Sequence, residues 1–353
     1  MKIGIDGNEA NIENRVGVGQ YAYNIISQLH QHDTTNHYYI YLKSQPLTDL
    51  PPENDHWHYI ICGPSQLWTR FALPLKLFTQ QIKLDYFFSP SHYSPLFSPC
   101  PTIPTIHDLG YLDSLDQFNK KDIYQLVNWT RQSIQKAHHI IAVSEFTKNE
   151  IHRIYHIPLT KISVIPNGVG DIPQFSTLAQ KKVLKKFNIN SPYFLTLGTL
   201  KPNKNIPFLL SAFSQTNEKL LVIAGKKGWL FNDIFTIVKK LKLQKRVIFT
   251  DYITENEKWI LLKNATATVL PSTYEGFGIP AIESLYSGTS VIASDIPAYR
   301  ETLSHDVTYI DPQNQTDLIA ALNQTKSKRL VVVEKKYTWT NSAKLLITLF
   351  SKI

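Results

Sequence analysis

Short apolar runs alternate with longer amphipathic segments along the first half of the chain. The apolar runs have the length of buried strands, and the segments between them carry the period of helices. This alternation is typical of a parallel sheet covered by helices. The predicted strands are Lys2–Asp6, Tyr38–Leu42, Tyr86–Ser89, Thr102–His107 and His139–Val143, and the predicted helices include Tyr21–His30 and Gln125–Ala137.

The same alternation begins again in the second half. Its predicted strands are Tyr193–Gly198, Leu220–Ala224, Val247–Thr250, Ala267–Leu270 and Ser290–Ala293, with helices at Ile206–Phe213, Asn232–Leu241 and Glu255–Lys263. Between the two series, the Pro and Gly residues of 165–173 break both periods. We therefore predict two α/β domains, at residues 1–168 and 169–336. Residues 337–353 should form a last helix that packs back on the N-terminal domain.

Composition is that of an ordinary globular protein, with 43% apolar and 18% charged residues in a chain of 353. No stretch approaches the roughly 18 apolar residues of a membrane span. The chain starts directly with a strand-like run, so we expect a cytoplasmic location. Cys62 and Cys100 are too few for a disulfide framework. We expect no required metal or other cofactor, because no cluster has metal-ligand spacing and no Asp-x-Asp occurs.

The net charge of +9 is unevenly placed along the chain. Residues 1–166 carry 13 Lys or Arg against 14 Asp or Glu, while residues 167–353 carry 24 against 14. A basic half can attract a nucleotide, a nucleic acid or an anionic membrane surface. An exposed, lysine-rich helix face at 181–186 explains the same charge equally well. Residues 68–83 fit either a helix on a membrane surface or, more commonly, a helix that covers the N-terminal domain.

One segment combines a strand end, a glycine-bearing loop and a helix start. It reads Glu275-Gly-Phe-Gly-Ile-Pro-Ala-Ile-Glu283 and follows the predicted strand Ala267–Leu270 after the residues Pro-Ser-Thr-Tyr. Ligands of open parallel sheets bind at the carboxyl ends of strands, and the first turn of a helix attracts anions. Backbone N–H groups of Phe277, Gly278 and Ile279 should face such an anion. The two glutamates suit neutral hydroxyl groups, although ordinary surface positions are equally compatible with their spacing.

Three further positions are candidates for the same chemistry. Gly17-Val-Gly19 precedes an amphipathic segment and would let backbone N–H groups approach a phosphate, or simply form a turn. His107 ends a predicted strand and has either a structural role or a catalytic one. Lys201 and Lys204 follow another strand end, where they fit a phosphate site or the solvent-exposed surface.

Taken together, these motifs resemble the retaining glycosyltransferases of family four, also called group 1 glycosyltransferases. The Glu-x7-Glu pattern of residues 275–283 and its continuation Ala-Ser-Asp-Ile-Pro-Ala-Tyr-Arg-Glu carry the resemblance. Further matches are Gly17-Val-Gly19, Ile106-His-Asp-Leu109, Ala142-Val-Ser-Glu-Phe-Thr147, Ile165-Pro-Asn-Gly168, Leu197-Gly-Thr-Leu-Lys-Pro-Asn-Lys-Asn205 and Val222-Ile-Ala-Gly225. The resemblance implies the α/β GT-B fold, in which two Rossmann-like domains face each other across a deep cleft.

The resemblance also implies a role for each candidate. Glu275 would contact the transferred sugar and Glu283 the nucleotide ribose. Lys204 would bind the diphosphate, with Lys201 in place of the Arg that many members carry at the position of Thr199. His107 would contact the donor sugar, either to help stabilise positive charge that develops there or, as we favour, to orient a hydroxyl group by hydrogen bonding. The Gly17–Gly19 loop would lie near the diphosphate and acceptor, and Ile253 would mark the pocket of the base.

On the same grounds we expect transfer of a hexose, with mannose favoured, from a nucleoside diphosphate sugar to a glycan or lipid-linked acceptor with retention. The variant Gly-Thr-Leu-x-Pro-x-Lys-Asn favours GDP-mannose over UDP-sugars and suggests assembly of a bacterial surface polysaccharide. The partners would then include the inner membrane, contacted peripherally, but no nucleic acid. The alternatives are a GT-B epimerase or hydrolase of sugar nucleotides, and a non-catalytic module that binds them.

Overall fold

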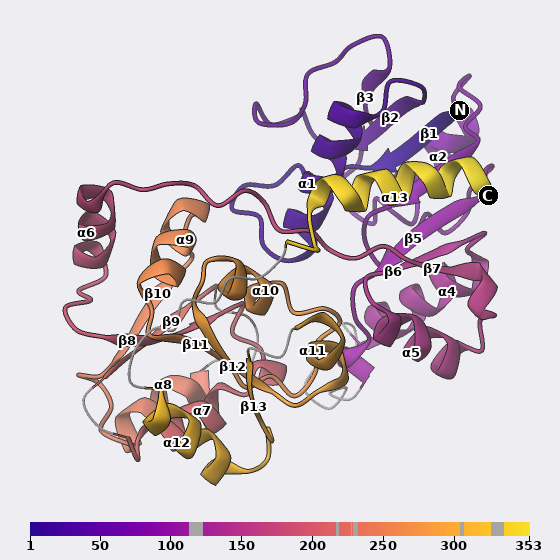
Figure 1. Ribbon diagram of the computed structural model, residues 1–353. Helices are drawn as coiled ribbons and strands as arrows, with labels where there is room; N and C mark the ends of the chain where they lie inside the picture. The colour runs from indigo at the N-terminus through magenta and orange to yellow at the C-terminus, as the bar shows by residue number, and fades with distance from the viewer. Residues whose placement is uncertain (113–122, 217–218, 227, 229–231, 304–306, 326–334) are drawn as a thin grey trace. The chain divides into compact units, whose positions relative to one another are not determined.

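The computed structural model describes residues 1–112, 123–216, 219–226, 228, 232–303, 307–325 and 335–353. The chain divides into two compact units, each built around one parallel sheet (Figure 1). Unit 1 consists of Met1–Gly168 together with Tyr337–Ile353, and unit 2 consists of Val169–Lys336.

The sheet of unit 1 has seven strands in the order β3-β2-β1-β4-β5-β6-β7, and every neighbouring pair is parallel. The central strands are buried on both faces, which explains their continuous apolar sequences. The strands are β1 (Lys2–Asp6), β2 (His37–Leu42), β3 (Trp57–Ile61), β4 (Tyr86–Ser89), β5 (Thr102–Ile106), β6 (Ile140–Ala142) and β7 (Ile162–Val164).

Helices complete the core of unit 1. They are α1 (Val18–His32), α2 (Ala72–Thr79), the π-helix η2 (Gln125–Trp129), α4 (Thr130–Lys136), α5 (Glu145–Tyr155) and α13 (Trp339–Lys352), with the 3-10 turn η3 at Leu159–Lys161. Helices α1 and α13 lie side by side and share one core with β1 and β2. The Ser342 hydroxyl donates to the carbonyl oxygen of Pro166 at 2.6 Å, and the Thr340 hydroxyl donates to Gln28 at 2.6 Å. The C-terminal helix is therefore part of unit 1.

The sheet of unit 2 has six parallel strands in the order β10-β9-β8-β11-β12-β13. Neighbouring strands that are distant in sequence, such as β8 and β11, require crossover connections, which the helices supply. The strands are β8 (Tyr193–Leu197), β9 (Leu220–Ala224), β10 (Val247–Asp251), β11 (Ala267–Leu270), β12 (Ser290–Ser294) and β13 (Val307–Ile310).

The helices of unit 2 are α6 (Thr177–Lys186), η4 (Pro202–Lys204), α7 (Ile206–Phe213), α8 (Asn232–Lys240), α9 (Glu255–Asn264), α10 (Ile279–Tyr286), α11 (Pro297–Thr302) and α12 (Gln315–Gln324). One core joins the strands to α7, α8 and α12. Within the described part of the chain, no helix of either unit is long and apolar enough to cross a membrane.

The candidate residues of unit 2 lie on the loops and the helix that follow the carboxyl ends of β8, β10 and β11. Ligands of open parallel sheets bind at this edge.

Candidate active site

The carboxyl ends of three neighbouring strands in unit 2 are held together by backbone contacts. Gly198, after β8, donates its N–H to the carbonyl oxygen of Ala224 at 3.0 Å. Gly225, after β9, donates its N–H to the backbone carbonyl oxygen of Asp251 at 3.0 Å. Gly225 has φ +153°, and a Cβ atom there would overlap the carbonyl oxygen of Gly198. Only glycine fits this close approach. The loop that carries Lys201 and Lys204 therefore starts from a fixed point.

This lysine loop is joined to the loop that carries Glu275. The N–H of Thr273 donates to the carbonyl oxygen of Asn203 at 2.9 Å, and the Asn203 side chain donates to the carbonyl oxygen of Tyr274 at 3.1 Å. Beside these contacts, Lys204 Nζ donates to Glu275 Oε1 at 2.5 Å. Their side chains are 18% and 13% exposed, so the two opposite charges are largely shielded from water. The structure thus brings together Lys204 and Glu275, which lie 71 residues apart.

The turn before helix α10 rests on Tyr299 from α11. Gly278 precedes the helix with φ +87°, a left-handed conformation that favours glycine, and a Cβ there would overlap the Tyr299 ring. The Tyr299 hydroxyl also lies 3.4 Å from Glu275 Oε1. Phe277 is buried, and its carbonyl oxygen accepts a hydrogen bond from Thr302 at 2.9 Å. Ile279 begins the helix, Pro280 has no N–H, and the N–H of Ala281 donates to the carbonyl oxygen of Gly278 at 3.0 Å.

Glu283 lies one turn further along α10 and pairs with a lysine of α9. Lys258 Nζ donates to Glu283 Oε1 at 2.5 Å and also lies 2.8 Å from Glu255 Oε2. Burial raises the pKa of the Glu283 carboxyl, and the charge of Lys258 opposes this rise. The Lys258 and Glu283 side chains are 16% and 10% exposed. The lysine thus favours the charged, hydrogen-bond-accepting form of this carboxylate.

The other predicted residues of unit 2 are less closely tied to this cluster. Lys201 is half-buried directly before η4, with its stem beside Gly228. Thr199 is also half-buried, between Gly198 and Leu200. Ile253 is half-buried in the loop after β10. Their assignments to the phosphate and base subsites stay predictions.

In unit 1, His107 stands at the carboxyl end of β5 among other rings. Its Nε2 donates to the carbonyl oxygen of Pro90 at 3.0 Å, and its backbone N–H donates to His92 Nε2 at 3.2 Å. The rings of His92 and His107 are stacked with centroids 5.5 Å apart, and the Tyr21 ring meets His107 edge-on at 4.7 Å. Burial lowers the pKa of His107 to about 4, and His92 acts in the same direction. The imidazole is therefore neutral at pH 7.

The glycine loop is linked to His107 through helix α1. The helix begins at Val18, earlier than predicted, so that Gly19 lies in its first turn and Tyr21, which contacts His107, lies in the next. Gly17 precedes the helix with φ +50°, and a Cβ atom on Gly19 would approach the carbonyl oxygen of Glu9 to 3.0 Å. Glycine at position 19 thus permits close packing of the loop on the helix.

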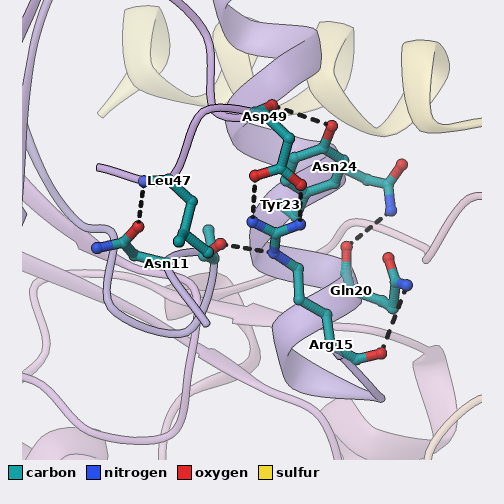
Figure 2. A network of polar contacts seen from close by, with 8 residues as sticks. Asn11, Arg15, Gln20, Tyr23, Asn24, Leu47 and Asp49 are labelled. Atoms are coloured by element: carbon teal, nitrogen blue, oxygen red, sulfur yellow. Dashed lines mark hydrogen bonds and ion pairs between the residues drawn. The ribbon is translucent and has the colours of Figure 1, made fainter. Parts of the chain in front are cut away.

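Arg15 fixes the approach to this loop (Figure 2). Its Nε donates to the carbonyl oxygen of Ala10 at 2.6 Å, and its two terminal nitrogens donate to the Asp49 carboxylate at 2.5 and 2.9 Å. The guanidinium also stacks over the Tyr23 ring at 4.2 Å. A bidentate pair of this kind fixes orientation as well as distance. The loop before Gly17 is therefore anchored to both α1 and the segment around Asp49.

Sequence reasoning did not single out four of these residues. Tyr299 lies within the quoted continuation of the glutamate motif, which was its only signal. Arg15, His92 and Lys258 gave none, because each depends on contacts between elements distant in sequence. Among the described residues, no group of three or more His, Cys, Asp or Glu side chains could hold a metal ion.

Two family models match successive parts of the chain. "Glycosyltransferase Family 4" matches residues 16–171, and "Glycosyl transferases group 1" matches residues 179–345. Together they cover nearly all of both units. The α/β fold of two Rossmann-like units predicted from the sequence is also that of the structurally similar protein HepE of Anabaena, solved in complex with UDP-glucose. That structure gives a TM-score of 0.77 at 15% identity and covers 100% of each chain.

Curated relatives are similar to a smaller part of the chain than HepE is. The chain is 32% identical over 220 residues to the O-antigen chain mannosyltransferase RfbU of Salmonella typhimurium, and 25% identical over 257 residues to the O-antigen chain mannosyltransferase B of Escherichia coli. The first match spans 62% of this chain and 59% of the relative, and the second spans 68% and 67%. The chain thus matches about three fifths to two thirds of these relatives' lengths.

Proposed function

Because the chain belongs to the group 1 and family 4 glycosyltransferases and has their GT-B fold, we propose that it transfers a hexose from a nucleoside diphosphate sugar to an acceptor hydroxyl, with retention at the anomeric carbon. The observation that carries the proposal is the pairing of Lys204 with Glu275 beside the turn that begins α10. This arrangement offers a cation, a helix N-terminus and a hydroxyl-binding carboxylate within one short stretch of the unit 2 surface.

Each group matches one part of the donor. Lys204 and the first turn of α10 supply positive charge for a diphosphate. Glu275, neutralised by Lys204, can accept hydrogen bonds from sugar hydroxyls without repelling the phosphates. Glu283, which accepts a hydrogen bond from Lys258, can also accept from the ribose hydroxyls. Ile253 lines the base subsite, and Lys201 assists the diphosphate in place of the arginine that Thr199 replaces.

The chemistry rests on positioning and charge. As the glycosidic bond breaks, negative charge accumulates on the leaving diphosphate, and Lys204 stabilises it more strongly than in the ground state. His107 contributes as a hydrogen-bonding group, because its imidazole is neutral at pH 7 and is not an imidazolium that could act as an acid. With Nε2 bound to Pro90, its Nδ1 accepts a hydrogen bond from a sugar hydroxyl. The Gly17–Gly19 loop meets the diphosphate and the acceptor.

The names of the relatives point to mannose as the hexose, since two of them are named O-antigen chain mannosyltransferases. GDP-mannose is therefore the proposed donor, with UDP-sugars as the alternative because HepE was solved with UDP-glucose. The acceptor is a glycan or lipid-linked glycan of a bacterial surface polysaccharide. The reaction takes place in the cytoplasm, at the inner face of the membrane.

A panel of nucleoside diphosphate sugars tests this proposal. Thermal unfolding with each nucleotide should identify GDP-mannose as the most stabilising ligand, because a ligand that binds the native state raises its unfolding temperature. Turnover of that donor should then require a glycan acceptor. Donor hydrolysis or epimerisation at the same rate without an acceptor would instead indicate the other enzymatic alternatives, and binding without turnover would indicate a non-catalytic module.

Two isosteric variants separate the proposed roles of the glutamates. Glu283→Gln should weaken binding of GDP itself, because the ribose is present with or without the sugar. Glu275→Gln should keep or tighten GDP binding, since it leaves Lys204 without a competing carboxylate, yet it should abolish most turnover. Equal losses of GDP affinity in both variants, measured by calorimetry, would show that the two carboxylates do not divide sugar and ribose between them.

A further inference from the structure

Helix α2 of unit 1 has one buried face and one apolar face that the described residues leave uncovered. Leu73 and Leu77 are buried in a core with Tyr41 and Phe87. On the opposite side, Phe71, Leu75 and Phe78 are 64%, 66% and 59% exposed. Their spacing places them on one side of the helix, since residues three and four apart are neighbours. The expectation that segment 68–83 simply covers the domain therefore holds for one face only.

Two other exposed apolar side chains lie on segments tied to this helix. Leu67, 54% exposed, accepts the backbone N–H of Phe71 at 3.0 Å. Phe97 is 58% exposed, and its neighbour Leu96 donates to the carbonyl oxygen of Thr69 at 3.4 Å. The side chains of residues 67, 71, 75, 78 and 97 together are called the apolar patch below. Large exposed groups gathered in this way mark an interaction site, whereas scattered ones are ordinary.

Basic residues predominate in the segments that carry the patch and in the segment that carries Lys136. Residues 56–84, 86–107 and 123–144 contain five Lys or Arg and no Asp or Glu. Lys136 anchors one of these charges at the patch, because its Nζ donates to the carbonyl oxygen of Leu96 at 3.2 Å and lies 4.8 Å from the centroid of the Phe97 ring. The intervening Asp85 accepts the backbone N–H of Lys2 at 2.7 Å. This local charge is positive although the first 166 residues sum to −1.

We propose that this apolar patch and its basic border bind unit 1 to an anionic lipid surface. Aromatic and leucine side chains that enter the headgroup region, with lysine and arginine beside them, are the composition of interfacial membrane contacts. A second copy of the chain fits less well, because two patches that face each other would bring like charges together. A protein partner would have to be both acidic and apolar at the contact, whereas anionic headgroups above acyl chains supply both features in one surface.

The patch is also connected to the His107 cluster. Tyr93 follows His92 directly and meets the Trp129 ring edge-on at 5.8 Å. Trp129 in turn carries the Arg70 guanidinium over its ring at 4.6 Å, one residue before Phe71. The loop between β4 and β5 thus holds His92 near one end and Phe97 near the other. A lipid-linked acceptor, which rests on the proposed function, would be presented beside the residues that unit 1 contributes to catalysis.

Vesicle sedimentation with the full chain tests the proposal without requiring turnover. Wild type should bind vesicles of phosphatidylethanolamine and phosphatidylglycerol, and bind pure phosphatidylcholine much less. The triple change Phe71→Ser, Leu75→Ser and Phe78→Ser should lower the partition coefficient at least about tenfold. A matched control, Leu178→Ser with Leu345→Ser, changes side chains that are 78% and 47% exposed on α6 and α13 and should bind like wild type.

The basic residues beside the patch allow a second, independent experiment. Lys76→Gln with Lys83→Gln should weaken binding at low salt and matter little at high salt, because exposed charges are screened. Unchanged vesicle binding by the triple variant would overturn the proposal. So would an oligomer of the wild type that the triple variant dissolves while neither binds vesicles, because the patch would then join copies of the chain.

The unfolding temperature and nucleotide affinity of every variant should match wild type. If the triple variant were unstable, Leu75→Ser alone, with the same vesicles, would decide the question. A wild type that binds vesicles through the patch but transfers no sugar would keep this inference and reject the proposed reaction.

Discussion

Removal of the Lys258 charge should destabilise unit 2, because this largely buried lysine is the cation that pairs with Glu283. Lys258→Met keeps most of the aliphatic stem but leaves Glu283, whose side chain is 10% exposed, without its cation. Loss of one partner from a buried ion pair costs about 3–5 kcal/mol. We take the lower value, because Lys258 is shared with Glu255, which is 54% exposed. For a unit of this size, about 3 kcal/mol lowers the unfolding temperature by about 6–12 °C.

The loss should depend on pH in a defined direction. Burial raises the pKa of Glu283 in the folded protein, and in the variant no lysine opposes that rise. A carboxyl with a raised folded pKa gives its full stability below the unfolded pKa, and the stability is lost as the pH rises through the folded value. The deficit of Lys258→Met should therefore be largest near pH 8 and shrink as the pH falls toward about 5.

Thermal unfolding followed by near-ultraviolet circular dichroism at both pH values measures this difference. Adding Glu283→Gln to Lys258→Met should recover at least half of the loss, because the double variant buries no unpaired charge. The single variant Glu283→Gln is the matched control for the lost carboxylate. An unfolding temperature of Lys258→Met within about 1 °C of wild type at pH 8 would refute the reasoning, because a desolvated, unpaired carboxylate must lower the stability by more than that. A double variant that is no more stable than Lys258→Met would refute it as well.

Three further outcomes follow from the site. Lys204→Ala should lower turnover about 10²–10³-fold, whereas Lys201→Ala should lower it far less, and equal rates in a steady-state assay would remove Lys204 from the site. The imidazole of His107 should not titrate between about pH 5 and 8 in NMR spectra, and His107→Ala should lose most turnover while GDP affinity stays within about threefold, or roughly 0.7 kcal/mol. Gly278→Ala should weaken GDP binding, because the added Cβ atom would overlap the Tyr299 ring. Adding Tyr299→Ala should restore part of the GDP affinity. If the double variant binds GDP no better than Gly278→Ala, the loss comes from the positive φ of residue 278 and not from the overlap.

The strands that sequence reasoning found and missed differ in their position in the sheets. The central strands were all predicted, because burial on both faces gives an uninterrupted apolar run. Strands β3, β7 and β13 were missed, and each lies at an edge of its sheet. In Val307–Ile310 the burial alternates irregularly, with an exposed threonine inside the strand. A mixed sequence of four residues does not separate such a strand from a loop. The edge strand β10 was found because its run Val-Ile-Phe is apolar.

Helix limits were harder to predict than helix positions. Helix α1 starts at Val18 instead of Tyr21, because Gly17 provides the turn and Gly19 is accepted within the helix. The predicted helix Gln125–Ala137 is present, but its first turn, Gln125–Trp129, is a π-helix. Such a widening depends on packing and has no simple sequence signal.

The residues of the candidate site that belong to local sequence motifs were predictable from the sequence. Lys204 and Glu275 each follow a strand end, and the parallel sheet places β8 beside β11, so their proximity follows from topology. The partner of Glu283 was not predictable in this way. Lys258 lies on a helix, and which face of α9 meets α10 depends on tertiary packing. The neutral state of His107 likewise depends on His92 and on burial, which no residue near it in sequence reveals.

The two lysine partners imply different behaviour for the two glutamates when a donor binds. Lys258 lies against Glu255 and Glu283 together, so two carboxylates hold it where it is. Lys204 has one carboxylate, Glu275, within ion-pair distance among the described residues. A diphosphate bound as proposed would add a second anion beside Lys204 and share its charge. The Glu275 oxygen would then be less engaged and better able to accept from a sugar hydroxyl. Recognition of the diphosphate and of the sugar would thus be coupled through Lys204, whereas the ribose contact of Glu283 would be independent of both.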